Sequence, residues 1–200
     1  AQQVALQFIN AQIDSPAVAL KPVTELLVEI RTNEGAWARL QKSKSWKNHV
    51  KPHLTEVKKR AFSIFDNASY DDSERIDAIQ FLSAAGALAT KSLDWLSGSL
   101  NAQNSPTIQT TIIEILGQSN NSQVAELLLS RWAMLTPTVR EQIIDTLLDR
   151  PGSATQLQDA LAAGHPASNQ LSAVQRERLV THRDAQIRER AVKLFDVEAV

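Results

Sequence analysis

A helical pattern recurs along the chain from Asp71 onward. In each copy a residue that can cap a helix precedes apolar residues three or four positions apart, the spacing that places them on one helix face. The copies begin at Asp71, Ser105, Thr136 and Asp184. Their predicted inward-facing residues are Ile76, Ile79, Leu82 and Ala85; Ile108, Ile112, Ile115 and Leu116; Val139, Ile143, Ile144, Leu147 and Leu148; and Ile187, Ala191, Leu194 and Phe195. A sequence that repeats one amphipathic helix predicts an all-α fold.

Turn-forming residues mark the expected ends of these helices. Glu74 lies three residues after Asp71, the spacing of a capping box, and Pro106 and Pro137 follow their caps at the first helical position. Gly86, Gly117 and the Pro151-Gly152 pair are expected to end the first three copies.

The repeat length predicts paired antiparallel helices. Ile76 and Ile108 stand 32 residues apart and Ile108 and Val139 stand 31 apart, with second helices expected over 88–100 and 123–135. Because such a pair cannot bury its apolar face alone, the sequence predicts a HEAT/armadillo-like α-solenoid (an α-α superhelix) of about five to six helical pairs. The next interval, from Val139 to Ile187, is 48 residues, which predicts a short-helix insertion near 153–182 that breaks the regular stack.

Residues 1–70 are predicted to be irregular helical repeats that join residues 71–200 in one continuous solenoid domain, with 67–72 as the joint. Helices are expected over 4–13, from Val23 to about Leu40, and after Pro52. The chain lacks an initiator Met and opens on a helical pattern, so we interpret it as a piece of a longer protein.

Composition excludes several classes. The 21 Lys+Arg and 22 Asp+Glu residues leave a net charge of −1, which disfavours nucleic-acid binding by the whole surface. With no Cys, the chain has no disulfide framework, thiolate zinc site or Cys nucleophile. No apolar run is long enough to span a bilayer, so no membrane insertion by this segment is predicted.

A family resemblance rests on the stretch from about Arg60 to Phe195. The matching features are Arg131-Trp132, Thr136-Pro137-x-Val139-Arg140, Leu147-Leu148-x-Arg150-Pro151, Ala160-Leu161 ending in Gly164, and Arg178-Leu179-x-x-His182 before Ile187-Arg188. Together they resemble the HEAT-like helical region of large planctomycete-type multidomain proteins described as membrane-bound dehydrogenases with a haem-binding domain.

The resemblance implies a helical spacer between a β-propeller and a cytochrome-type module with a CxxCH motif. It also implies an extracytoplasmic, periplasmic location. Because this chain has no Cys, the haem function cannot be carried over, and no cofactor is expected in this chain.

The chain contains four histidines. His49 and His53 have the i, i+4 spacing of a helical metal pair, but Pro52 between them favours the start of a new helix, and only Glu56 is near enough to add a ligand. His165 is expected in a loop, and His182 is expected to donate to carbonyls at a helix C-terminus. No metal site is predicted.

The best candidate for a functional surface is the basic segment, which we define as residues 39–60 together with the nearby Trp37. It carries eight cations against one acid, Glu56, and two tryptophans that could stack on bases or sugars while the cations bind phosphates. A solvated face is the preferred interpretation, ahead of contact with a protein or polyanion and then with nucleic acid. The residues are Trp37, Arg39, Lys42, Lys44, Trp46, Lys47, Lys51, Lys58, Lys59 and Arg60.

Trp95 and Trp132 are predicted to be core residues of second helices. Arg75, Arg140, Arg188 and Arg190 are predicted to form charge pairs between repeats, such as Arg140 with Glu141 or Asp145. No phosphate loop, nucleophile elbow or HExxH motif occurs, so no catalytic residue is assigned.

These observations favour a non-catalytic scaffold for protein–protein or interdomain interaction, excised from a larger dehydrogenase- or cytochrome-type redox protein. Its partners would be other domains of the parent protein or another protein. The alternative is a HEAT-like DNA-binding or DNA-glycosylase module that uses the basic segment.

Overall fold

The computed structural model describes residues 20–32, 34–88, 90–119 and 121–196. Within them all regular secondary structure is helical, so the chain is an all-α protein. The helix predicted over 4–13 lies outside the described residues. The chain divides into two compact units, Ala1–Ala89 and Thr90–Val200, each with its own packing. The turn at 67–72 lies inside the first unit, between two of its helices.

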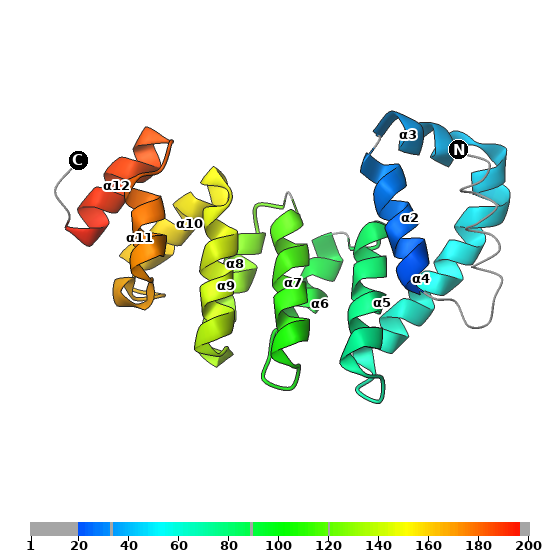
Figure 1. Cartoon of the computed structure of the whole chain (residues 1–200), viewed down its shortest axis with the longest axis horizontal. Helices are drawn as coiled ribbons and strands as arrows, with labels where there is room; N and C mark the ends of the chain where they lie inside the picture. Colours follow the sequence, from blue (N-terminus) through cyan, green and yellow to red (C-terminus); the bar gives the residue numbers. More distant parts are fainter. Residues whose placement is uncertain (1–19, 33, 89, 120, 197–200) are drawn as a thin grey trace. The chain divides into compact units, whose positions relative to one another are not determined.

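The first unit contains four described α-helices and one π-helical turn. These are α2 (Leu20–Thr32), α3 (Glu34–Lys42), η1 (Trp46–Val50), α4 (Lys51–Asp66) and α5 (Asp72–Ala84). Helix α5 packs against α2 and α4, and η1 connects α3 to α4 (Figure 1). The core consists of apolar residues with almost no exposure, among them Val23, Leu27, Val50, Ala61, Phe65, Ala78, Ile79, Phe81 and Leu82.

The predicted start and end of α5 are confirmed. The Asp71 carboxylate accepts from the Glu74 backbone N–H at 2.8 Å, and the Glu74 carboxylate accepts from the Asp71 backbone N–H at 3.1 Å, which completes a capping box. Gly86 has φ of +64°, a left-handed conformation that favours glycine and ends the helix. Ile76 is only half-buried, because the buried face of α5 instead passes through Ala78, Ile79 and Leu82.

The second unit contains seven described α-helices and two short 3₁₀ turns. These are α6 (Thr90–Gly98), α7 (Pro106–Gln118), α8 (Val124–Ser130), η2 (Trp132–Met134), α9 (Pro137–Leu148), α10 (Pro151–Ala162), η3 (Ser168–Gln170), α11 (Ala173–Val180) and α12 (Ala185–Phe195). The second helices are therefore shorter than predicted, and the segment after Ser130 is η2 rather than a continuation of α8.

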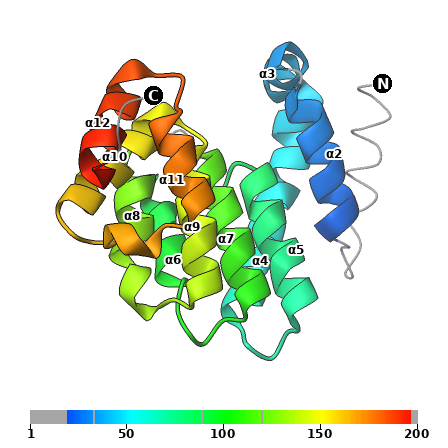
Figure 2. The ribbon, with the colours of Figure 1, turned by 60° about the vertical axis from the view of Figure 1, so that its left-hand side comes forward.

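The helices of the second unit form two packed rows. One row is α7, α9 and α11, and the other is α6, α8, α10 and α12, with each helix packed on the next in its row (Figures 1 and 2). The predicted inward residues of α7 and α9 are buried, as are Ile187 and Ala191 of α12. Leu194 and Phe195 are half-buried.

The segment near 153–182, predicted to interrupt the stack, instead contributes α11 to the first row and most of α10 to the second. Helix α10 packs against α8, α9 and α12, and α11 packs against α9 and α12. The Pro151-Gly152 pair begins α10 rather than ending α9, because proline fits the first turn of a helix. Ser172 caps α11 with a capping box to Gln175, so first-row helices begin after Ser105, Thr136 and Ser172, at intervals of 31 and 36 residues.

Gly117 does not end α7, which runs on to Gln118. A Cβ on Gly117 would lie closer than 3.0 Å to the Thr146 Cγ2 methyl of α9, so glycine here permits the close approach of two first-row helices.

A recurring polar contact links helix starts to the segment before them. At the fourth position of α5, α7, α9 and α12, a long side chain donates to main-chain carbonyls of the preceding turn or helix. Helix ends leave carbonyls without intrahelical partners, and these side chains satisfy some of them. The bonds are Arg75 Nε to Phe65 O at 2.9 Å, Gln109 Nε2 to Asn101 O at 2.8 Å and Asn104 O at 2.7 Å, Arg140 Nε to Trp132 O at 2.9 Å, and Arg188 Nη1 to His182 O at 2.7 Å.

The predicted charge pairs of Arg140 are therefore wrong. Its guanidinium also donates to Ala133 O at 3.0 Å, and no ion pair to Glu141 or Asp145 forms. Ion pairs between helices of the second unit join Arg178 to Asp145 and Asp149, and Arg190 to Asp159. The charge pair predicted for Arg190 is therefore confirmed.

We predict that Arg188→Met lowers the free energy of unfolding by about 1 kcal/mol, because one half-buried carbonyl loses its donor. Arg176→Met is the matched control: Arg176 occupies the same position in α11 and is exposed, so its effect should stay within about 0.5 kcal/mol. Urea denaturation of the full chain measures both. Equal effects of the two substitutions would contradict a special role for this contact.

Candidate functional site

The basic segment lies in the first unit and spans α3, η1 and α4. Trp37 and Trp46 meet edge to face, with ring centroids 5.1 Å apart and an interplanar angle of 79°. Trp46 is 5% exposed, and the Arg31 guanidinium lies 5.7 Å from the centroid of the Trp37 ring. Both indoles are therefore engaged within the unit, and the stacking surface expected from the sequence is largely covered.

The cations of this segment are exposed except for Lys58, which is half-buried; they are Arg39, Lys42, Lys44, Lys47, Lys51, Lys59 and Arg60. Lys59 Nζ binds Glu56 Oε1 at 2.8 Å. Burial lowers the pKa of Lys58, and the charge of Arg31 lowers it further. Arg31 is itself held by the end of α5, since its Nη1 donates to Ala84 O at 2.7 Å and Ser83 O at 3.2 Å.

The lowered pKa of Lys58 predicts a dependence of stability on pH. Between that pKa and 10.5 the unfolded chain binds more protons than the folded chain, so stability rises with pH through this window, and the penalty is complete below it. Lys58→Met should therefore raise the Tm at pH 7, and this gain should shrink as the pH approaches 10.5. Thermal unfolding followed by circular dichroism checks this, with exposed Lys59→Met as the control. A gain that did not depend on pH would indicate added apolar packing instead.

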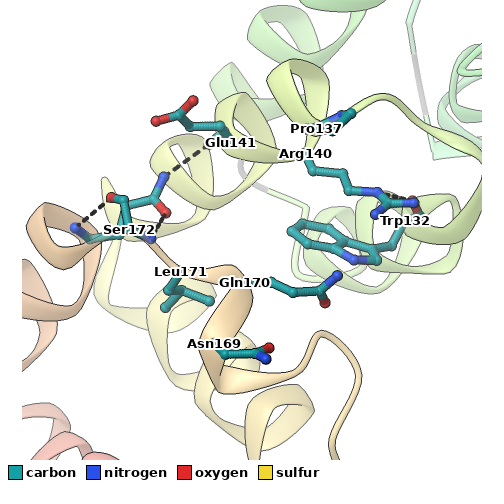
Figure 3. Close-up of a pocket in the computed structure, with 9 residues that line it drawn as sticks. Trp132, Pro137, Arg140, Glu141, Asn169, Gln170, Leu171 and Ser172 are labelled. Atoms are coloured by element: carbon teal, nitrogen blue, oxygen red, sulfur yellow. Dashed lines mark hydrogen bonds between the residues drawn. The ribbon is translucent and has the colours of Figure 1, made fainter.

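A pocket with a mixed polar and aromatic lining lies in the second unit. It has a volume of about 410 Å³, within the range of ligand sites. It lies where η2, the start of α9, η3 and the start of α11 meet (Figure 3). We call it the η2–η3 pocket, and its lining residues are Trp132, Pro137, Arg140, Glu141, Asn169, Gln170, Leu171, Ser172 and Gln175.

One wall of the η2–η3 pocket is the half-buried Trp132. The Arg140 guanidinium lies 5.7 Å from the centroid of its ring, a cation–π contact, and is fixed there by its bonds to the carbonyls of Trp132 and Ala133. The indole Nε1 of Trp132 is buried and has no acceptor among the described residues. The prediction that Trp132 is a core residue of a second helix is therefore wrong, because it lies in η2 and is half-buried. Trp95 does lie on a second helix, α6, but it is half-buried as well.

The opposite wall is held by Gln175, which is 3% exposed. Its amide nitrogen donates to Glu141 O at 3.3 Å and Asp145 Oδ1 at 3.0 Å, and its amide oxygen accepts from the Ser172 backbone N–H at 3.1 Å. Because every polar atom of this amide is occupied, Gln175 fixes the start of α11 against α9. Gln175 therefore holds the pocket-lining helices α9 and α11 together and does not itself serve as a contact for a ligand.

Three exposed side chains of the pocket keep hydrogen-bonding capacity. Gln170 points toward the indole of Trp132 in Figure 3; its amide oxygen accepts from the Ala167 backbone N–H at 3.0 Å, which leaves its amide nitrogen as a donor. The amide of Asn169 and the carboxylate of Glu141 bind no described residue. Sequence reasoning missed this site because Asn169 and Gln170 come from an irregular loop that only the fold brings to α9.

The histidines behave differently from one another. His182 Nδ1 accepts from the Asp184 backbone N–H at 3.0 Å, so the ring is an acceptor here and not the predicted donor to carbonyls. His165 is exposed in its loop, as expected. The side chain of His49 lies outside the described residues, and no group of three potential metal ligands gathers among those that are described.

Comparisons with known proteins give no further guide. No family model, no curated protein and no solved structure matches the chain. In the part of the chain that the structure describes, no helix is both long and apolar enough to cross a membrane.

Proposed function

We propose that the chain is a non-catalytic HEAT-like scaffold that holds a protein partner or neighbouring domains, with the second unit as an α-solenoid. Three features support this proposal: the two packed rows, the side-chain caps of α7 and α11, and the starts of α7, α9 and α11 at intervals of 31 and 36 residues. In such arrays each repeat completes the core of its neighbour, and the stacked faces bind partners.

The observation that carries the proposal is how the long polar side chains of the second unit are used. Gln109, Arg140, Arg150 and Arg188 donate to main-chain carbonyls of other segments, and Gln175 bridges α11 to α9. These contacts fix one helix relative to the next. A protein that must hold a surface in a fixed geometry requires such rigid connections between its repeats.

The DNA-binding alternative has weaker support. It needs indoles that stack on bases, whereas Trp46 is buried and Trp37 is covered by Arg31. The exposed cations of the basic segment are better suited to a secondary contact with an acidic partner.

The parent protein is a separate part of the proposal. The resemblance to the helical region of dehydrogenase- and cytochrome-type proteins is its sole support, and the coding sequence on both sides of residues 1–200 tests it. A β-propeller segment before Ala1 and a CxxCH motif after Val200 would support the assignment, and unrelated flanking domains would refute it.

Site-specific photocrosslinking in the native cells tests the scaffold itself. A photoreactive amino acid at Asn169, in the η2–η3 pocket, should give a discrete adduct with a protein identifiable by mass spectrometry. The same residue at Glu114, which is exposed on α7, is the control. Adducts of equal yield and the same composition at both positions, or none at either, would contradict a partner surface at this pocket.

A further inference from the structure

We propose that the η2–η3 pocket binds an extended segment of a partner polypeptide, mainly through its main chain. This inference rests on the scaffold function proposed above and names the kind of partner that the pocket takes. The argument depends on the charge of the pocket, on its unused hydrogen-bonding groups and on the apolar residues beside it.

The charges of the pocket favour an uncharged ligand. Its lining contains one cation, Arg140, and one anion, Glu141, which cancel. A polyanion would meet the Glu141 carboxylate and a polycation would meet the guanidinium of Arg140. A peptide main chain carries no net charge. It can therefore lie beside both the guanidinium and the carboxylate without placing a like charge against either.

The unused polar groups match those of peptide units. The amide nitrogen of Gln170 is a donor, the amide of Asn169 offers a donor and an acceptor, and the Glu141 carboxylate is an acceptor. Extended main chain presents alternating C=O and N–H groups, which pair with such a set.

The Trp132 wall of the pocket argues against a saccharide as the occupant. Sugars bind tryptophan by lying on an open indole face, but Trp132 is half-buried and Arg140 lies over its ring. Exposed apolar side chains adjoin the lining in the sequence instead. Met134, 51% exposed, follows Trp132 by two residues, and Val174, 66% exposed, directly precedes Gln175. These suit the side chains of a peptide.

The test uses the full chain and a phage library of random linear dodecapeptides. Peptides enriched on the wild type are synthesised, and their Kd is measured by fluorescence anisotropy. Asn169→Ala combined with Gln170→Ala should weaken binding at least tenfold, while Gln103→Ala combined with Gln118→Ala, two exposed amides elsewhere in the unit, should not change it. All four residues are exposed, so both double variants should keep the fold.

Backbone N-methylation separates main-chain recognition from side-chain recognition. Methylating two central amides of a bound peptide should weaken binding at least tenfold, whereas alanine substitution at most positions should have a smaller effect. If no peptide is enriched, or if enriched peptides bind the pocket variant as well as the wild type, the inference is wrong. Binding on a glycan array that the Asn169/Gln170 variant abolishes would assign a saccharide instead and also overturn it.

The outcomes distinguish this inference from the proposed function. A discrete crosslink at Asn169 to a folded protein, with no peptide binding, would leave the scaffold proposal intact and refute recognition of an extended segment. Failure of both experiments would refute both proposals.

Discussion

Leu147→Asp is expected to unfold most of the second unit at once. Leu147 is 1% exposed on α9, the helix that packs against α7, α8, α10 and α11. The substitution removes a buried leucine, worth about 2–5 kcal/mol, and places a carboxylate where nothing pairs with it. The total penalty should exceed about 4 kcal/mol, a large part of the stability of a domain of this size.

Hydrogen exchange followed by mass spectrometry measures how far the damage spreads. Amides of α7, α8, α10 and α11 should lose protection together with those of α9, because each helix completes the core of its neighbours. Helices α2, α4 and α5 should keep their protection, since they belong to the other compact unit. Thr138→Asp, at an exposed position in the first turn of α9, is the control and should leave exchange unchanged. Fraying confined to α9 would contradict the coupling between rows.

Helix starts and buried faces were predictable because both are local. The capping box at Asp71, the cap at Ser105 and the prolines after Ser105 and Thr136 act within one turn, and a 3.6-residue period identifies the buried face wherever a helix forms. The cap predicted at Thr136 is wrong in one respect, because its side chain makes no cap hydrogen bond. The equivalence of Ile76 with Ile108 was less accurate, because aligning the caps pairs Ile108 with Glu74 instead.

The partners of the arginines could not be predicted from sequence spacing. Arg140 lies one residue from Glu141 and five from Asp145, which made ion pairs the simplest expectation. Carbonyls at a preceding helix end are fixed and costly to leave without a donor, whereas an exposed ion pair contributes little. The carbonyls of Trp132 and Ala133 therefore bind the guanidinium.

The candidate site was less predictable than the fold. The sequence indicates the basic segment because its cations lie close together along the chain, yet its indoles are engaged within the first unit. The η2–η3 pocket combines residues more than 30 positions apart, and its amides lie in an irregular loop whose path no periodicity indicates. The one local signal was the capping box from Ser172 to Gln175, which marked a helix start beside the loop.

Gly117→Ala is expected to destabilise the second unit although alanine is the better helix former. The new methyl group would overlap Thr146 Cγ2, and overpacking of this kind costs about 1–3 kcal/mol. The gain in helix propensity recovers about 1 kcal/mol. We therefore expect a net loss of up to about 2 kcal/mol in urea denaturation. Gly152→Ala in α10, where a Cβ would meet nothing within 4 Å, is the control and should be neutral or stabilising.

A double-mutant cycle with Thr146→Ser isolates the cause. Serine keeps the hydroxyl but lacks Cγ2, the atom that a Cβ at position 117 would overlap, and the Thr146 Cβ at 3.8 Å is an ordinary contact. In the Thr146→Ser background Gly117→Ala should therefore become neutral or stabilising by up to about 1 kcal/mol, a coupling of about 2 kcal/mol between the two sites. Additive effects would show that Gly117 is required for a reason other than the approach of α7 to α9. A large coupling would show that Gly117 sets the distance between α7 and α9. Because each first-row helix packs on the next, this glycine would then help to determine the geometry of the row.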